Sequence, residues 1–234
     1  IDVVLLDDAF QHRHVKTGIS ILLIDYNRLI QEDMLLPSGR LREPASARSR
    51  AQIILVTRSP ERIKPIEMRN LAKRMDLQIH QHLFFTTIGY GELKPVYPGM
   101  DIKDPASLKA KKAPVLILAG IANPRPIRRY ARSISTQIHE IIFPDHHRYT
   151  NKDLEKIRER YQTIGHPDTL ILTTEKDAMR LQSLQPEESL RQVLCYVTIH
   201  VRFLNNDHTE FNKIILNYVR SNKRDNILYQ GKSR

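Results

Sequence analysis

Short apolar runs rich in Ile, Val and Leu alternate with charged stretches of helical period along most of this chain. Continuous apolar runs are typical of strands buried on both faces, and intervening helices arrange such strands in parallel. We therefore predict an α/β fold built from βα units, with a mostly parallel sheet. The predicted strands are residues 3–7, 19–25, 52–57, 78–86, 115–119, 135–143, 169–173 and 193–201. The predicted helices are residues 43–50, 65–75, 125–133, 151–164, 175–182 and 209–222.

The middle of the chain breaks this alternation. Residues 89–113 contain Gly, Pro and Lys with little periodicity, which is typical of an exposed connection. A length of 234 residues also permits two small domains. We predict one lobe in residues 1–88, a connection in 89–113 and a second, C-terminal α/β lobe in 114–234.

The net charge narrows the class of partner. Lys and Arg total 37 against 26 Asp and Glu, a formal net charge of +11. We therefore expect an anionic partner, which is a nucleic acid, an anionic membrane surface or a phosphorylated substrate. The single cysteine, Cys195, excludes an intramolecular disulfide and fits a reducing compartment. No apolar stretch approaches the roughly 20 residues that cross a bilayer, so we expect any membrane contact of these residues to be peripheral.

Two adjacent carboxylates, Asp7 and Asp8, follow the first apolar run. At the carboxyl edge of a parallel sheet such a pair is suited to hold Mg²⁺ beside a nucleotide, because phosphoryl transfer needs charge neutralised on the phosphate oxygens. The alternative is that the pair caps a helix or begins a turn. No G-x-x-x-x-G-K-[ST] phosphate loop occurs, and the first residue is Ile1. We therefore expect the C-terminal part of a longer enzyme whose phosphate loop lies upstream.

A second motif, L-L-P-S-G-R-L-R-E-P, occupies residues 35–44. Gly39 permits a close backbone approach, and Arg40 and Arg42 offer planar donors suited to phosphate. Glu43 stands at an expected helix start, where its carboxylate is either a metal ligand or a charge that compensates the helix dipole.

A third motif, F-P-D-H-H-R-Y, occupies residues 143–149 between a predicted strand and a predicted helix. Its acid, imidazoles and tyrosine suit acid–base chemistry or a metal site, although we expect one of the two histidines to have no chemical role. The helix that follows has Thr150 at its N-cap and Asp153 three residues later, the pattern of a capping box.

Two further segments follow predicted strands, G-I-A-N-P at 120–124 and T-T-E-K-D at 173–177. In the second, Thr174 and Asp177 have the same spacing of hydroxyl and acid at a helix start. If the strands run parallel, we expect both segments to lie on the same sheet edge as Asp7.

Together these motifs resemble the tetraacyldisaccharide 4′-kinase family, also called lipid A 4′-kinase. Each motif is weak alone, but the ordered set is specific. The family pattern has Gly where this chain has Ala9, a change that leaves the carboxylates in place. The motifs that carry the resemblance are D-D-x-F-Q-H at 7–12, L-L-P-x-G-x-L-R-E-P at 35–44, G-I-x-N-P at 120–124, D-H at 145–146 and T-E-K-D-A at 174–178.

The resemblance implies a two-lobe P-loop-type kinase of lipid A biosynthesis, with mostly parallel sheets in α/β/α sandwich layers. With ATP and Mg²⁺, such an enzyme phosphorylates the 4′-hydroxyl of a tetraacyldisaccharide 1-phosphate, an acylated glucosamine disaccharide phosphate. The implied location is peripheral, on the cytoplasmic face of the bacterial inner membrane, at an anionic membrane surface. No nucleic acid and no obligate protein partner are implied. Residues 1–88 would be the remainder of the nucleotide-binding lobe, and the fragment would be inactive alone.

The resemblance also implies roles for single residues. Asp7, Asp8 and Glu43 would lie beside ATP and Mg²⁺ as cofactor-binding and metal residues, and Asp8 would have a catalytic role as well. His146 would be the catalytic histidine that pairs with an upstream aspartate to activate the sugar hydroxyl. The implied substrate-binding residues are Arg42, Gln11, His12 and Asn123.

Two alternatives stay open at this point. Another P-loop NTPase or a metal-dependent phosphoesterase would also use the acids. The D-H-H triplet occurs in manganese phosphoesterases, although the further Asp and His clusters that those enzymes need are not evident. A basic nucleic-acid-binding module is supported only by the charge, because no helix-turn-helix, zinc or base-stacking signature occurs.

Overall fold

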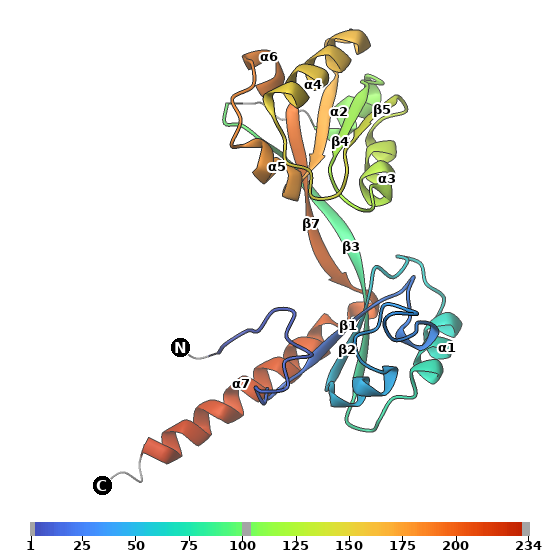
Figure 1. Ribbon diagram of the computed structural model, residues 1–234, viewed down its shortest axis with the longest axis vertical. Helices are drawn as coiled ribbons and strands as arrows, with labels where there is room; N and C mark the ends of the chain where they lie inside the picture. Colours follow the sequence, from blue (N-terminus) through green and yellow to red (C-terminus); the bar gives the residue numbers. More distant parts are fainter. Residues whose placement is uncertain (1–2, 100–103, 231–234) are drawn as a thin grey trace. The chain divides into compact units, whose positions relative to one another are not determined.

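Two compact units make up the protein in the computed structural model, which describes residues 3–99 and 104–230, with side chains up to residue 222 (Figure 1). The first unit contains the residues up to Ile88 and those from Val201 onward. The second unit is Gly89–His200. The C-terminal residues therefore pack with the first unit. The predicted assignment of a nucleotide-binding lobe and a second lobe stays a prediction.

Parallel strands form the sheet of the first unit. Its elements are β1 (Ile21–Asp25), the 3-10 helices η1 (Ile30–Glu32) and η2 (Ala45–Arg50), β2 (Ile53–Thr57), α1 (Pro65–Met75), the start of β3 (His82–Pro95), η3 (Leu204–Asn206) and α7 (His208–Gln230). β2 pairs in parallel with β1 on one side and with β3 on the other.

The core of the first unit lies between α1 and this sheet. Ile54 and Val56 of β2 are fully buried and cluster with Leu71 and Met75 of α1. Pro65 begins α1, where its fixed φ suits the first turn and its missing N–H has no helical partner to lose. The apolar face of α1 therefore packs on the buried strand, and each covers the apolar surface of the other.

The second unit is also built on parallel strands. Its elements are the end of β3, α2 (Pro105–Ala110), β4 (Val115–Ala119), α3 (Arg125–Ile134), β5 (Ile138–Ile142), α4 (Asn151–Ile164), β6 (Leu170–Thr174), α5 (Glu175–Leu181), α6 (Glu188–Arg191) and the start of β7 (Leu194–Phe203). β4 pairs in parallel with β5 and β6, and β6 pairs in parallel with β7.

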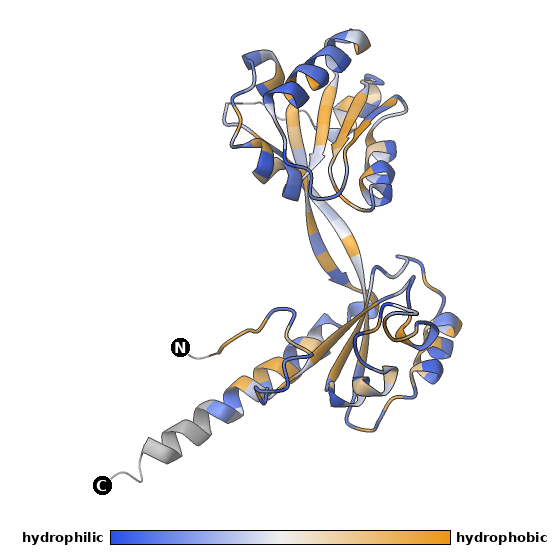
Figure 2. Ribbon diagram, viewed as in Figure 1, coloured by the Kyte–Doolittle hydropathy of each residue, from blue (hydrophilic) through white to orange (hydrophobic). Residues whose placement is uncertain are grey.

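Helices cover both faces of the sheet in the second unit. Val115 and Ile117 of β4 pack in one apolar cluster with α2 and α3. Leu116 and Leu118 of the same strand pack in another with α4, α5 and α6. Figure 2 shows the result as apolar strands between helices of mixed hydropathy. The predicted α/β/α layering is confirmed here, because a strand buried on both faces needs apolar residues at every position.

The strands hydrogen-bond in the order β1-β2-β3-β7-β6-β4-β5. Gly89 faces His200 and Gly91 faces Thr198, so β3 and β7 run antiparallel to each other there. A Cβ on Gly91 would lie 2.4 Å from Thr198 Oγ1, so a larger residue there would require the Thr198 side chain to shift. The pairs β1–β2, β2–β3, β4–β5, β4–β6 and β6–β7 are parallel, which confirms the prediction of a mostly parallel sheet.

The predicted first strand is wrong. Residues 3–6 form no strand with the described chain, and Val4 and Leu5 are 69% and 92% exposed. An apolar run becomes a strand only where a neighbouring strand completes its backbone hydrogen bonds, and no described strand does so. Asp7 therefore lies in a turn and not at the end of a strand.

Other predicted bounds also needed correction. Residues 43–50 form the 3-10 helix η2, which begins at Ala45, rather than an α-helix. The predicted connection 89–113 carries the end of β3 and all of α2; its residues 100–103 lie outside the described residues. α7 extends beyond the predicted bound to Gln230. β3 was underestimated because its partner β7 lies far along the chain, where local periodicity carries no information.

Candidate functional site

The first unit brings together the motifs at residues 7–12 and 35–44. Arg42 Nη1 lies 3.5 Å from Gln11 Oε1. Glu43 Oε2 accepts from Arg50 at 2.6 Å and from Arg13 at 3.2 Å. The predicted substrate and cofactor residues Gln11, Arg42 and Glu43 are therefore neighbours, and Arg13 and Arg50 join them although the sequence analysis did not single them out.

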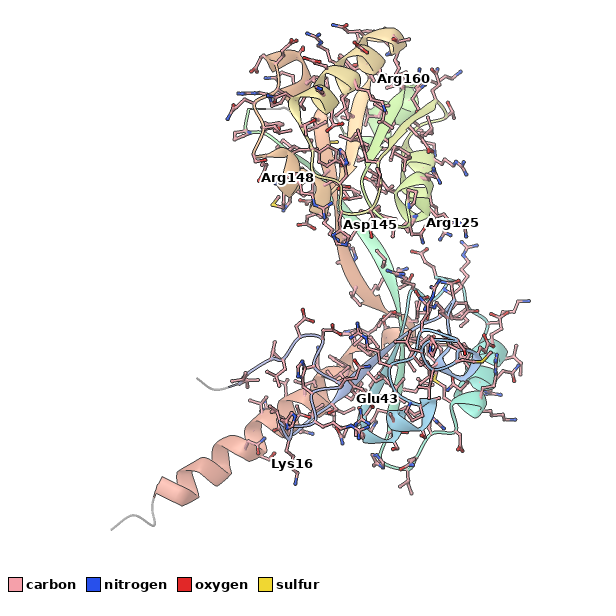
Figure 3. The ribbon with its side chains drawn as sticks, viewed as in Figure 1. Lys16, Glu43, Arg125, Asp145, Arg148 and Arg160 are labelled. Atoms are coloured by element: carbon pink, nitrogen blue, oxygen red, sulfur yellow. The ribbon has the colours of Figure 1, made fainter. Side chains whose placement is uncertain are left out.

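Arg50 joins the two segments further. Its Nη2 donates to the carbonyl of Phe10 at 3.2 Å, and its guanidinium lies 4.7 Å from the centre of the Phe10 ring. The hydrogen bond from Arg50, followed by that from Arg13, holds the pKa of Glu43 below its ordinary value. Glu43 is thus an ionised carboxylate in a basic setting, labelled in Figure 3.

The loop before Arg42 is closed by its own backbone. Leu41 N–H donates to Met34 O, and Leu36 N–H donates to Leu41 O, both at 2.9 Å. A Cβ on Gly39 would lie 2.1 Å from the Met34 carbonyl oxygen. The predicted close backbone approach at Gly39 is therefore confirmed.

Asp7 and Asp8 lie together in an exposed turn, and Asp8 has a left-handed φ of 49°. Two adjacent solvent-facing carboxylates fit a hydrated Mg²⁺, which takes one or two carboxylates and keeps several waters. Across the described chain, however, no three His, Cys, Asp or Glu side chains form a cluster that could hold a metal. The metal role of Asp7, Asp8 and Glu43 stays a prediction. His12, also exposed, donates its backbone N–H to Ala9 O in the same segment.

The second unit gathers three other motifs at the carboxyl ends of β4, β5 and β6, a region we call the carboxyl edge, defined by residues 120–124, 143–149 and 174–180. Parallel pairing brings these strand ends together, as expected for an α/β site. A Cβ on Gly120 would lie 3.2 Å from atoms of Asp177, His147 and Tyr149. The three motifs are thus in mutual contact around one glycine. In Figure 3, Asp145 and Arg125 are labelled at this end of the unit.

Asp177 is the buried centre of the carboxyl edge. Its side chain is 0% exposed, and its Oδ2 accepts from Gly120 N–H at 2.9 Å and Thr174 Oγ1 at 2.8 Å. Its Oδ1 accepts from Arg180 Nη1 at 3.1 Å. Burial, and then the adjacent Asp177 carboxylate, raise the pKa of Tyr149 well above its ordinary value. The buried acid therefore joins strand ends that are separate in the sequence.

The structure distinguishes the two histidines of the third motif. His147 Nε2 lies 3.1 Å from Asp153 Oδ2, and its ring stacks on Phe143 at 4.3 Å. Asp153 also completes the predicted capping box with Thr150. Burial disfavours the Asp153 carboxylate, but the hydrogen bonds from Thr150 and His147 outweigh it and lower its pKa. His147 thus contacts Asp153 and stabilises the start of α4.

His146 is the exposed histidine, with a side chain 69% exposed and a left-handed φ of 59°. Its backbone N–H donates to Asp145 Oδ1 at 2.9 Å, and its Nδ1 lies 3.3 Å from Arg180 Nη2. It therefore faces solvent at the carboxyl edge. Asn123 is also exposed, and its Oδ1 accepts from Arg125 N–H at 3.1 Å at the start of α3.

The predicted site residues are divided between the two units. Asp7, Asp8, Gln11, His12, Arg42 and Glu43 belong to the first unit, and Asn123 and His146 belong to the second. A single pocket that unites them stays a prediction. Arg180 was not among the predicted site residues, although its position three residues after Asp177 on a helix face was a usable signal. Among the helices described, none combines the length and apolarity needed to span a bilayer.

Comparison with known proteins gives consistent matches. The profile of the family described as tetraacyldisaccharide-1-P 4′-kinase matches residues 1–220. A tetraacyldisaccharide 4′-kinase of Bacteroides thetaiotaomicron is 41% identical over 232 residues, covering 96% of this chain and 61% of its own length. One from Bacteroides fragilis is 42% identical, covering 99% of this chain and 62% of its own length. The chain thus spans about three fifths of these relatives.

A solved structure shares the fold. The crystal structure of the "apo" form of LpxK from Aquifex aeolicus in complex with ATP aligns with a TM-score of 0.59, at 20% sequence identity. The alignment covers 91% of this chain and 56% of that one.

Proposed function

Because the chain belongs to the tetraacyldisaccharide 4′-kinase family, we propose that it is part of a kinase of lipid A biosynthesis. The reaction is transfer of the ATP γ-phosphoryl group to the 4′-hydroxyl of a tetraacyldisaccharide 1-phosphate. The chain supplies about three fifths of such an enzyme by comparison with its relatives. The upstream polypeptide supplies the phosphate loop, since none occurs in these residues.

One observation supports this proposal above the others: the motifs are assembled in space. Residues 7–12 contact residues 42–50 in the first unit, and residues 120, 146–149 and 177–180 meet in the second. In each unit, the assembled motifs place basic side chains beside carboxylates. This arrangement suits a reaction that depends on positioning and charge neutralisation.

Each assembly has a proposed task. Asp7, Asp8 and Glu43 would hold the nucleotide-bound Mg²⁺, which would supply neutralisation of the charge on the transferring phosphoryl oxygens. Arg42, beside Gln11 and His12, binds substrate phosphate through its planar donors. In the second unit, His146 and an upstream aspartate activate the sugar hydroxyl, while Asn123 contributes to substrate binding.

The basic composition suits an acylated, anionic substrate. The net charge of +11 would draw the protein to an anionic membrane surface, at about 1 kcal/mol per Lys or Arg near the headgroups. We place the enzyme peripherally on the cytoplasmic face of the bacterial inner membrane, without nucleic acid and without an obligate protein partner. Binding to vesicles with anionic lipid, weakened by salt, would support this location; equal binding to neutral vesicles would contradict it.

A kinase assay on the complete enzyme tests the function. His146→Ala should lower kcat by at least about 100-fold, because it removes half of the acid–base pair that His146 forms with the upstream aspartate, and such catalysis contributes that much, while nucleotide affinity stays unchanged. The control is His80→Ala, an exposed histidine of the first unit outside every motif. Unchanged turnover in His146→Ala would remove His146 from the catalytic residues.

A second assay tests the division of labour. Residues 1–234 alone, with ATP and Mg²⁺, should not phosphorylate the disaccharide, because the phosphate loop is absent from them. Measurable phosphorylation would contradict this division. Hydrolysis of phosphodiesters with Mn²⁺, or salt-dependent binding of nucleic acid without binding of lipid, would favour the alternative functions instead.

A further inference from the structure

Arg180 is the one side chain that connects the buried centre of the carboxyl edge with the exposed His146, among the contacts of the described residues. Its Nη2 lies 3.3 Å from His146 Nδ1. A guanidinium has donors and no acceptor, so Nδ1 must receive this hydrogen bond through its lone pair. In a neutral imidazole the proton then sits on the other nitrogen, Nε2.

The position of Arg180 is set by the core and not by solvent. Its Nη1 donates to Asp177 Oδ1 at 3.1 Å and lies 3.4 Å from Gly120 O, and its side chain is only 24% exposed. Asp177 is itself held at the strand ends by Gly120 N–H and Thr174 Oγ1. The guanidinium is therefore fixed before it reaches His146, which lowers the entropic cost of the contact.

The other side of the ring favours the same tautomer. His146 Nε2 lies 3.6 Å from Asp145 Oδ2, a carboxylate that attracts an N–H and repels a lone pair. The Asp145 Oδ1 atom accepts the His146 backbone N–H, so the carboxylate is anchored to the same turn. The cationic donor at Nδ1 and the carboxylate near Nε2 thus both favour a proton on Nε2.

We propose that Arg180, anchored on Asp177, is a positioning residue that fixes His146 in its Nε2–H tautomer. The consequence for the reaction rests on the proposed kinase function. His146 then acts as a donor whose Nε2–H orients the carboxylate of the upstream aspartate. That carboxylate receives the proton of the sugar hydroxyl as the sugar oxygen forms its bond to the γ-phosphorus of ATP and the bond from that phosphorus to ADP breaks. A ring without Arg180 would present Nε2 as a lone pair for part of the time and would orient that carboxylate less often.

The tautomer is measurable without catalysis. Two-bond ¹H–¹⁵N correlations of the histidine rings, recorded at a pH where the ring is neutral and assigned with His146→Asn, should show predominantly Nε2–H in the unmodified chain. Arg180→Gln should give a mixture of tautomers, and Arg180→Lys should restore part of the preference because it keeps a cationic donor. Arg158→Gln, which removes another ion-paired arginine of the second unit, is the control and should leave His146 unchanged.

Kinetics of the complete enzyme test whether the tautomer that Arg180 fixes matters for the reaction. Arg180→Gln should lower kcat about tenfold, the effect typical of losing a group that orients a histidine at a metal site. KM values should stay unchanged, and Arg180→Lys should recover part of the loss. An Nδ1–H tautomer in the unmodified chain, or an equal tautomer mixture with and without Arg180, would overturn the proposal. A tautomer change with unaltered kcat would overturn its link to the reaction. If the complete enzyme has no kinase activity but the tautomer responds as expected, the proposed function fails and the positioning of His146 stands.

Discussion

The motif assemblies of the two units are built by different means. In the second unit, the carboxyl edge is organised by Asp177, which is 0% exposed and joins the ends of β4 and β6. In the first unit, Glu43 is reached by Arg13 and Arg50, with side chains 65% and 33% exposed. One assembly is an extension of a core, whereas in the other, partly exposed arginines from the turn before β1 and from η2 surround Glu43.

This difference teaches where each assembly obtains its order. A buried carboxylate without its partners is costly, so the fold must keep the strand ends of the second unit together. Exposed ion pairs contribute little and are screened by salt. We therefore expect the carboxyl edge to be preformed, whereas the loops of the first unit are free to adjust around an anionic ligand at small cost.

The largest expected effect is that of Asp177→Ala. The change leaves the Gly120 N–H and the Arg180 guanidinium without their acceptor, which should lower the free energy of unfolding by about 3 kcal/mol. Urea denaturation measures this effect. Glu187→Ala is the control, because it removes the exposed partner of Arg158 in the same unit. Equal stability of the two variants would contradict the expectation that the buried carboxylate stabilises the fold more than an exposed ion pair does.

An intermediate effect is expected for Asp153→Ala, which removes the capping box of α4 and the partner of His147. The loss should be about 1 kcal/mol. Because the pKa of Asp153 is lowered in the folded state, its contribution is present above the ordinary Asp value and is lost as pH falls through its lower folded value. Stability curves of both proteins should therefore converge in acid; a constant difference down to the lowest pH would refute the assignment.

The smallest effect on stability is expected for Glu43→Gln in the first unit, since the carboxylate pairs with partly exposed arginines. Its pKa is more informative. A carboxyl ¹³C titration should place the Glu43 midpoint below its ordinary value, and Arg50→Ala should move that midpoint upward, because Arg50 is the main cause of the lowering. A normal midpoint in the unmodified chain would show that the arginines do not order this loop in solution.

How well the sequence predicted the structure depended on the kind of element. The bounds of α1, β4 and α4 agree with the predicted ranges, because an apolar period with a proline, cap or breaker at each end is local information. The segment 3–6 has the composition of a buried strand yet is exposed. Composition shows that a segment is able to form a strand, but a strand also needs a partner.

The candidate site shows the same division. The sequence alone indicated Asp145, His146 and Asp177 as candidate residues, and it also predicted the two capping pairs. The link through Arg180 was not, since it joins α5 to a loop that precedes it by more than 30 residues in the sequence.

By itself the sequence determined the α/β class, the local caps and the family to which the chain belongs. Those properties follow from periodicity and from ordered motifs, which need no knowledge of distant contacts. Only the tertiary structure decided that Asp177 is the buried centre of the carboxyl edge, that His147 holds α4 while His146 faces solvent, and that Arg13 and Arg50 surround Glu43. Hydrogen bonds and burial depend on which strand ends the fold brings together, and that pairing is a property of the whole chain.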